Sequence, residues 1–309
     1  MEKELLEIRS EGRFERTEES RAQVFLHGML SLLRELVRDK AALLGLIFFG
    51  ILIFVALAAP LVAPHDPTAH DLRKRLSPPS LLGGYLLGTD QMGRDALSRI
   101  IYGSRASLTV AMNVVLFAGS IGILLGIISG YFGGRVDEII MRLVDLQFSF
   151  PGLLIAMTLI AVLGPSLRNM VIALTINGWM VYARMARGVT LTLRDSLFVD
   201  AARSVGCSDW RIMFRHILPN LAAPLLTLAV LEWARIILAE AGLSFLGLGV
   251  QPPRSSWGLM IAEGRMYLSV AWWLVLFPSL AIAFTVLSIN LFVSWLRVIA
   301  DPFQRRARG

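Results

Sequence analysis

The segment from Ala41 to Val62, AALLGLIFFGILIFVALAAPLV, is a long run without a single charged side chain. About 20 apolar residues are enough to cross the hydrocarbon of a bilayer as a helix. The hydrocarbon contains no water to hydrogen-bond with backbone N–H and C=O groups. A single segment can cross it as a helix, because a helix pairs these groups internally. The run therefore predicts a membrane-spanning helix.

Five further apolar runs follow the first one along the chain. Together they predict six spanning helices, at about 41–62, 108–130, 139–163, 170–186, 223–243 and 271–295. The composition agrees, because 55% of the residues are hydrophobic and only 17% are charged, whereas soluble domains carry about 25% charged residues. We expect an all-α polytopic membrane protein in contact with the lipid bilayer.

Basic residues flank the first and last runs and predict the orientation of the chain. Arg34, Arg38 and Lys40 precede the first run, and such charges concentrate on the cytoplasmic side of spanning helices. An even number of spans brings the C-terminus back to that side, so we expect both termini in the cytoplasm. The net charge of +7 is therefore attributed to topology and lipid headgroups and not to nucleic-acid binding, because the basic residues are scattered at the ends of apolar runs.

These boundaries divide the chain into five parts. The parts are a cytosolic N-terminal extension (1–40), a first spanning helix (41–63), an external loop with an interfacial helix (64–105), a five-helix core that includes a cytoplasmic loop at 193–220 (106–300), and a cytoplasmic tail (301–309). The interfacial helix is expected to begin after Asp90 or Asp95, because aspartate is a favoured helix N-cap.

A polar segment, DAARSVGCSDWRIMFRHILPN from Asp200 to Asn220, separates the fourth and fifth runs. An apolar stripe at helical spacing leads into it, formed by Leu193, Leu197, Ala201 and Val205. Gly206 is expected to end this helix, because glycine adopts the left-handed backbone angles common just beyond a helix C-terminus. A second helix is expected to begin at Ser208 or Asp209, and Pro219 is expected to stop or kink it before the fifth span.

Two interpretations of this helix, glycine turn and helix remain open at this point. The pair has the size of an element that fits a groove on a cytosolic partner. Alternatively, both helices rest on lipid headgroups, as basic amphipathic helices often do.

The segment resembles the cytoplasmic loop of ATP-binding-cassette (ABC) importer permeases, whose pattern is E-A-A, three residues, Gly, nine residues, then I-x-L-P. The matching positions are Asp200, Ala201, Ala202, Gly206, Leu218 and Pro219. Two positions depart from the pattern, because Asp200 replaces the glutamate and His216 occupies the isoleucine position. Neither departure breaks the pattern of helix, turn and helix.

Three longer motifs extend the resemblance over most of the chain. They are LLGTDQMGRDALSRIIYGSRASL from Leu86, DLQFSFPGLLIA from Asp145, and AEAGLSFLGLGVQPPRSSWG from Ala239. They are similar to the permeases of dipeptide, oligopeptide and nickel importers, specifically to the subunit with an N-terminal cytosolic extension. The resemblance implies a type I ABC importer permease fold in a bacterial or archaeal cytoplasmic membrane.

The resemblance also implies a set of partners and a division of labour. This chain would form half of a translocation pathway beside a homologous second permease, and an extracytoplasmic binding protein would deliver the cargo, with peptides favoured over nickel or another small solute. Two cytosolic ABC ATPase subunits would dock on the loop through Asp200, Ala201, Ala202, Gly206, His216, Leu218 and Pro219. The chain has no G-x-x-x-x-G-K-[ST] phosphate loop, so ATP and Mg are expected on the partners, with no catalytic site and no cofactor here.

Ionisable residues within the fifth run are candidates for the pathway, because such groups are costly in lipid and so face protein or water. Glu232 and Arg235 are three positions apart and able to pair on one helix face. They either line the pathway or form a neutralised pair at a helix contact, and the sequence leaves both open. Glu240 lies near the external end within one of the motifs, which favours the pathway.

Two other classes of function receive less support. His65 and His70, each followed by an aspartate, use metal-ligating side chains, but the spacing around Pro67 does not place them on one face, so a solvated loop is expected and no metal site. An ion-coupled secondary transporter is the alternative transport class, and it usually shows buried midplane acids and an internal repeat, neither of which is evident.

Overall fold

The computed structural model describes residues 36–300 except 38 and 82, so most of the N-terminal extension and the whole tail predicted above lie outside the described residues. The described part is built from helices and loops without a β-strand, which confirms the all-α prediction. The helices are α2 (Lys40–Leu57), α3 (Ala59–Val62), α4 (Ala96–Phe132), α5 (Gly134–Phe148), α6 (Gly152–Leu163), α7 (Leu167–Arg194), α8 (Leu197–Ser204), α9 (Asp209–Arg211), α10 (Leu218–Phe245), α11 (Trp257–Gly264) and α12 (Trp273–Ala300).

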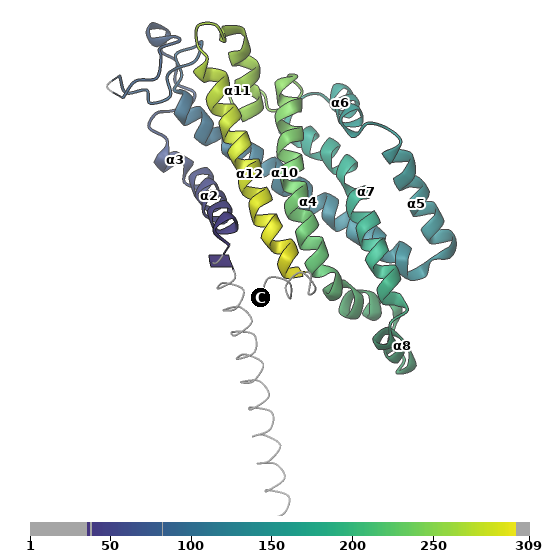
Figure 1. Cartoon of the computed structure of the whole chain (residues 1–309). Coiled ribbons are helices and arrows are strands. Elements are labelled where there is room, and N and C mark those ends of the chain that lie inside the picture. Colours follow the sequence, from purple (N-terminus) through teal and green to yellow (C-terminus); the bar gives the residue numbers. More distant parts are fainter. Residues whose placement is uncertain (1–35, 38, 82, 301–309) are drawn as a thin grey trace, which may run out of the picture.

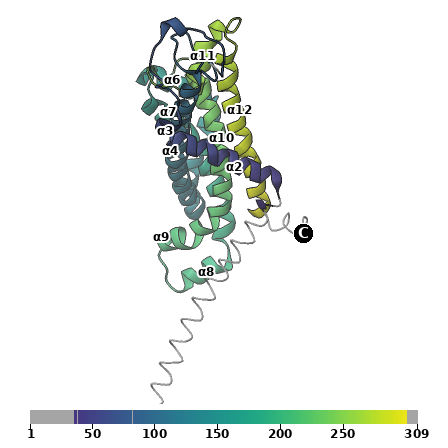
Figure 2. The same cartoon turned by 90° about the vertical axis from the view of Figure 1, so that its left-hand side faces the viewer.

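The helices form an elongated bundle with two distinct ends (Figure 1). The loop end carries the segment 63–95 together with α11, and the α8 end carries α8 and α9 (Figures 1 and 2). Helix α2 begins and α12 ends toward the α8 end. The first and the last long helices of the described chain therefore have these ends on the same side of the bundle.

Four helical units are long and apolar enough to cross a membrane: α2, α4, α12, and the continuous unit from Asp209 to Phe245 that contains α10. Helices α5 and α6 add a fifth if they count as one broken span. Helix α7, which contains the fourth predicted run, is 28 residues long but is not among these units. Its arginines and asparagines lower its hydropathy below that of the others.

The third predicted run is sharply bent and not one straight helix. Helix α5 ends at Phe148, α6 begins at Gly152, and their axes differ by 87°. Pro151 stands at the break, where its ring and missing N–H prevent a helix from continuing. Helix α5 runs along the outer edge of the bundle and α6 lies at the loop end (Figure 1).

Helix α4 is longer than predicted and includes the expected interfacial helix. Asp95 is its N-cap, and its side chain accepts a hydrogen bond from the backbone N–H of Ser98 at 3.0 Å. The helix then continues without a break to Phe132, so the short helix expected near 95–105 is the beginning of α4 and not a separate element. At 37 residues α4 spans about 55 Å, which exceeds a hydrocarbon thickness of about 30 Å.

Small residues bring α4 and α7 into close contact. A side chain at Gly122 would overlap the backbone carbonyl of Trp179, and one at Gly126 would place its Cβ 2.8 Å from that of Ala186. Gly130 continues the same face, because the i, i+4 positions of a helix lie on one side. Such positions allow helices to approach closely in membranes.

A buried ion network ties the loop end together. Arg94 donates from Nε to Oδ2 of Asp90 at 2.6 Å, and Arg99 donates to the same oxygen. Both guanidinium groups also reach Glu263 of α11, at 3.2 and 2.7 Å. Because Asp90 and both arginines are at most 6% exposed, the network fixes the 63–95 segment, α4 and α11 relative to one another.

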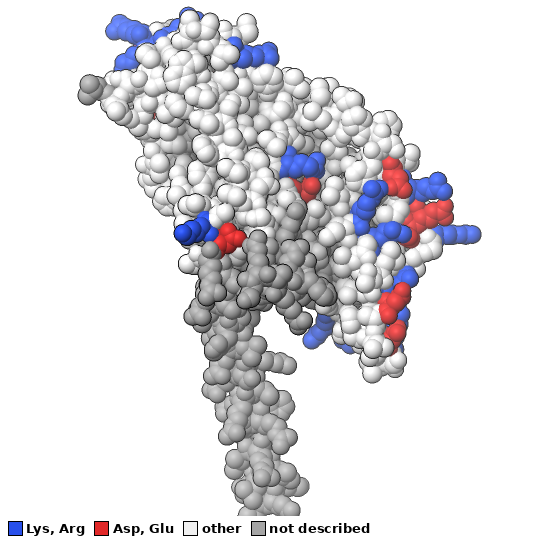
Figure 3. Space-filling view, viewed as in Figure 1, with Lys and Arg blue, Asp and Glu red and all other residues white. Residues whose placement is uncertain are grey.

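The outer surface between the two ends is mostly uncharged. Figure 3 shows Lys and Arg at the loop end and a mixture of basic and acidic side chains along the edge where α5 lies, with two small groups of opposite charge on the otherwise uncharged surface between them. Exposed apolar side chains are numerous on α2, where 17% of the spanning window is buried within the chain. A surface of this kind is expected where helices face lipid.

Candidate coupling and pathway sites

Gly206 ends α8 with the turn that the sequence predicts. Its φ is +78°, in the left-handed region that residues with a Cβ rarely adopt. The N–H of Gly206 donates to the carbonyl of Arg203 at 2.9 Å, and the N–H of Cys207 donates to the carbonyl of Ala202 at 3.0 Å. This pair of hydrogen bonds is the Schellman C-cap, so the turn between the two helices is well defined.

One side of the coupling element, which we define as residues 197–217, is packed against the bundle. Val199, Ala202 and Met213 are buried in a cluster with Ile127 of α4 and Ala186 of α7. The cluster gives this element a rigid apolar attachment to two long helices, because close-packed interiors transmit displacement.

A polar contact reinforces this attachment. The hydroxyl of Tyr131, at the end of α4, donates to Oδ1 of Asp209 at 2.7 Å. The guanidinium of Arg203 lies 5.5 Å from the centre of the same ring. Tyr131 thus touches both helices of the coupling element, on either side of Gly206.

The other side of the coupling element is an exposed apolar face. Leu197 is 89% exposed and Val205 is 78% exposed, and Ala201 between them is also exposed. On the second helix Trp210 is also exposed, and it stacks on Phe214 with ring centroids 5.7 Å apart. Most of the stripe predicted from the sequence therefore points away from the bundle, and α8 is held by Val199 and Ala202 instead.

The second helix of the element continues through Pro219 into α10, so Pro219 does not stop it. Ser208 occupies the predicted N-cap position, and residues 209–245 form one continuous helical unit. A π-helical segment, Ile212–Ile217, comes immediately before Pro219. The wider π turn relieves the clash and the missing hydrogen bond that proline introduces into a regular helix.

The predicted docking residues are thus spread over both sides of the element. Asp200 and Ala201 are exposed, and Asp200 lies 3.4 Å from Arg203. Ala202 is buried, His216 and Leu218 are half-buried, and Pro219 is exposed.

Glu232 and Arg235 form the ion pair that their spacing predicts. Nη2 of Arg235 lies 2.6 Å from Oε2 of Glu232, and Nε donates to the same oxygen at 2.8 Å. The Glu232 side chain is 8% exposed and that of Arg235 is 45% exposed. Arg235 is therefore the more exposed member of the pair. It lies on a helix that is long and apolar enough to span the membrane.

Glu240 occupies a different environment from that pair. It is fully buried, and it accepts hydrogen bonds from the hydroxyls of Ser107 and Ser244, both at 2.7 Å. In this arrangement Glu240 joins α10 to α4 and borders no open space in the described chain. Sequence alone could not place Ser107 beside it, because the two are 133 positions apart.

His65 of the 63–95 segment packs against neighbours in the same loop and in the N-cap of α4. The ring of His65 stacks on Tyr85 at 4.8 Å, and its Nδ1 lies 3.4 Å from Asp95. Asp66 instead accepts hydrogen bonds from Thr68. Within the described residues, no group of three or more His, Cys, Asp or Glu side chains is arranged to hold a metal ion.

Comparison with known proteins places the chain in a family. Residues 122–306 match the family described as the binding-protein-dependent transport system inner membrane component, and residues 31–79 match the N-terminal TM domain of oligopeptide transport permease C. The fold is similar to a chain of the inward-facing MetNI methionine ABC transporter, with a TM-score of 0.52 over 68% of this chain and 96% of that chain. At 16% identity this likeness concerns the fold alone.

Relatives with higher identity cover most of the sequence. The chain is 44% identical to the di/tripeptide transport system permease protein DppC of Pseudomonas aeruginosa, over 87% of this chain and 90% of the relative. It is 43% identical to the probable D,D-dipeptide permease DdpC of Escherichia coli (82% and 84% covered) and 40% identical to the glutathione permease GsiD of Pectobacterium atrosepticum (87% and 89%). The chain therefore belongs to the family of binding-protein-dependent transport system inner membrane components, the permease subunits of ABC importers.

Proposed function

We propose that this chain is one of two permease subunits of an ATP-driven importer of short peptides in the bacterial cytoplasmic membrane. The observation that carries the proposal is the identity of 40–44% to permeases whose names specify di/tripeptides, D,D-dipeptides and glutathione. An extracytoplasmic binding protein delivers the peptide, and a homologous second permease completes the pathway.

The α8 end is cytoplasmic and the loop end is external in this proposal. Six crossings are made by α2, α4, the broken pair α5 and α6, α7, α10 and α12. Arg184, Arg187 and Arg194 of α7 and the arginines of the coupling element lie toward the α8 end, in line with the positive-inside rule. Helix α7 tolerates its polar residues because it packs against α4 and not only against lipid.

The coupling element receives the motion of the cytosolic ATPase subunits, which bind ATP and Mg. Its exposed apolar face, built from Leu197, Val205 and Trp210, is the docking surface, because exposed apolar patches of this kind mark protein contacts. Its buried side transmits the movement to α4 and α7 through the packed cluster and Tyr131. Closure of the ATPases thereby biases a two-state permease, the usual basis of alternating access.

Glu232 and Arg235 border the pathway in this proposal. A guanidinium that is 45% exposed on a spanning helix is unfavourable in lipid, so it faces the water-filled interior or the second permease. Its carboxylate partner reduces that penalty, and the remaining donors are free to meet a peptide carboxylate.

The assembly is tested by tagging the chain, extracting it gently from its native membrane, and identifying the co-purifying proteins by mass spectrometry. We expect a second permease, ATPase subunits and a binding protein whose bound ligand is a short peptide. The variant Val205→Asp should lose the ATPase subunits and keep the second permease, because a charge is placed on the docking surface. Leu81→Asp is the matched control, since Leu81 is 86% exposed at the loop end, and this variant should keep every partner.

Either of two results would contradict the proposal. Wild-type chain recovered alone and still active would exclude an ATP-driven complex. Equal recovery of ATPase subunits with Val205→Asp and Leu81→Asp would exclude this docking surface.

A further inference from the structure

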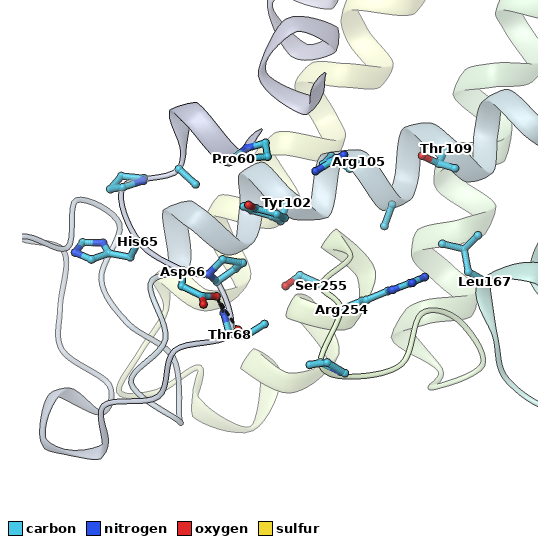
Figure 4. Close-up of a pocket in the computed structure, with 15 residues that line it drawn as sticks. Pro60, His65, Asp66, Thr68, Tyr102, Arg105, Thr109, Leu167, Arg254 and Ser255 are labelled. Atoms are coloured by element: carbon cyan, nitrogen blue, oxygen red, sulfur yellow. Dashed lines mark hydrogen bonds between the residues drawn. The ribbon is translucent and has the colours of Figure 1, made fainter. Parts of the chain in front are cut away.

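A cleft of about 950 Å³ opens at the loop end (Figure 4). Its walls are the segment that follows α3, the first turns of α4, and the segment between α10 and α11. Its volume lies within the roughly 300–1,000 Å³ of small-molecule sites. Its lining contains neither the coupling element nor the Glu232 and Arg235 pair, so it is a separate space in the fold.

Two arginines line this cleft with their charges uncompensated. Arg105 comes from α4 and Arg254 from the segment before α11 (Figure 4). Both side chains are exposed, and neither forms an ion pair with any residue that the structure describes. The contact of Arg105 is with the Tyr102 ring, 5.9 Å from its centre, and leaves the guanidinium donors available. An open cleft with two such groups favours an anionic ligand.

One acid shares the cleft without neutralising those arginines. Asp66 lies on the segment that follows α3, and it makes no ion pair with Arg105 or Arg254. Its Oδ1 accepts hydrogen bonds from the hydroxyl and the backbone N–H of Thr68, at 2.6 and 2.8 Å. These bonds lower the pKa of Asp66, so the carboxylate is ionised at neutral pH. Its Oδ2 has no hydrogen-bond partner within the described part of the chain and is free to meet a cation.

The remaining lining is largely apolar and offers room for side chains. Tyr102, Leu167 and four prolines belong to the lining. An anionic lipid headgroup would be held by the arginines but repelled by Asp66. Such a lipid would therefore leave the Asp66 carboxylate without a cationic partner. A ligand with separate positive and negative ends satisfies all of it.

We propose that this cleft binds the zwitterionic backbone of a short peptide, with Asp66 receiving its ammonium group and Arg105 and Arg254 receiving its carboxylate. The site rests on the proposed function and deepens it, because it places a peptide-binding step on the external side of the permease itself. It selects free termini and leaves the peptide side chains against apolar walls.

The test measures binding of three probes to the purified full chain in nanodiscs by titration calorimetry. The probes are trialanine, N-acetyl-trialanine and trialanine amide, which carry both terminal charges, only the carboxylate, and only the ammonium. Wild type should bind trialanine about tenfold more tightly than either capped form, because each capped end loses a charge-assisted hydrogen bond.

Each variant should lose all or part of the preference for one of the two free termini. Arg254→Gln should weaken trialanine binding several-fold and reduce its preference over trialanine amide, because only Arg105 then remains to bind the carboxylate, while the acetylated form is still rejected. Asp66→Asn should do the reverse, losing only the preference for a free amine. Arg73→Gln is the matched control, because Arg73 is exposed on the same external segment outside the cleft, and it should bind like wild type.

Three results would overturn the site. The first is absence of trialanine binding to the wild-type chain, and the second is identical probe preferences in Arg254→Gln, Asp66→Asn and Arg73→Gln. The third is binding of phosphatidylglycerol that Arg254→Gln abolishes, without binding of any peptide probe, which would identify a lipid site. If the ATPase subunits co-purify in the same preparation, the importer stands although the cleft proposal fails.

Discussion

At the scale of single residues, features fixed by nearby sequence were predictable and features formed by distant residues were not. The turn at Gly206 and the pair of Glu232 with Arg235 depend on residues a few positions apart, so their spacing sufficed. The environment of Glu240 depends on Ser107, and the ion network of Arg94 depends on Glu263, 169 positions away. Contacts of that length require the packing of the whole bundle.

The variant Gly206→Val should separate ATP hydrolysis from peptide uptake. A residue with a Cβ in the left-handed region costs about 1–2 kcal/mol, enough to shift a two-state equilibrium roughly 5- to 30-fold. No atom lies within 4 Å of a Cβ at this position, so the effect is one of backbone strain and not of crowding. The measurement is peptide imported per ATP hydrolysed by the reconstituted complex.

Gly206→Asn is the matched control, because asparagine tolerates left-handed angles better than valine. It should retain most of the wild-type ratio. Equal ratios for the valine and asparagine variants would mean that the turn does not carry coupling.

At the scale of elements, apolar runs in the sequence predicted where helices lie, but they did not predict where a helix breaks and where it continues. Pro151 stands at a break with a bend of 87°, whereas the helix continues through Pro219 after a π-helical segment, so the same residue type ends one helix and not the other. The stripe along α8 was identified correctly but faces outward, because periodicity indicates that a helix has an apolar face and not what covers it.

Gly126→Ala should destabilise the contact between α4 and α7 by about 1–3 kcal/mol, the usual effect of overpacking. The added methyl would meet the backbone carbonyl of Ala183, which cannot move aside easily. Thermal unfolding in detergent measures the change. Gly188→Ala, on α7 with no atom within 4 Å of the new Cβ, should be neutral or slightly stabilising, and a similar loss in both variants would refute the close contact.

Asp90→Asn should lower the stability of the loop end by roughly 3–5 kcal/mol, because it leaves two buried arginines with one acid fewer. Asp71→Asn tests an exposed pair on the same segment, in which Asp71 and Lys74 are 3.9 Å apart, and should cost less than about 1 kcal/mol. Limited proteolysis of the 63–95 segment provides the readout. If both variants were cleaved at the same rate, the buried network would not hold this segment.

At the scale of the whole molecule, the chain is a permease whose two ends differ in structure. The α8 end presents an apolar face on an element anchored to α4 and α7, and the loop end contains a cleft and a buried ion network. Composition predicted the membrane, and motifs predicted the family to which the chain belongs. Helix α7 is not among the candidate spans by hydropathy, and glycines of α4 pack closely against it.

The energy source of transport is the measurement that tests the central claim most directly. Uptake of radiolabelled trialanine is followed in proteoliposomes that contain the complete complex, with its binding protein on the external side. ATP supplied to the ATPase side should drive accumulation without any ion gradient. Accumulation driven by a proton gradient in the absence of ATP and of the ATPase subunits would contradict the account and identify an ion-coupled transporter.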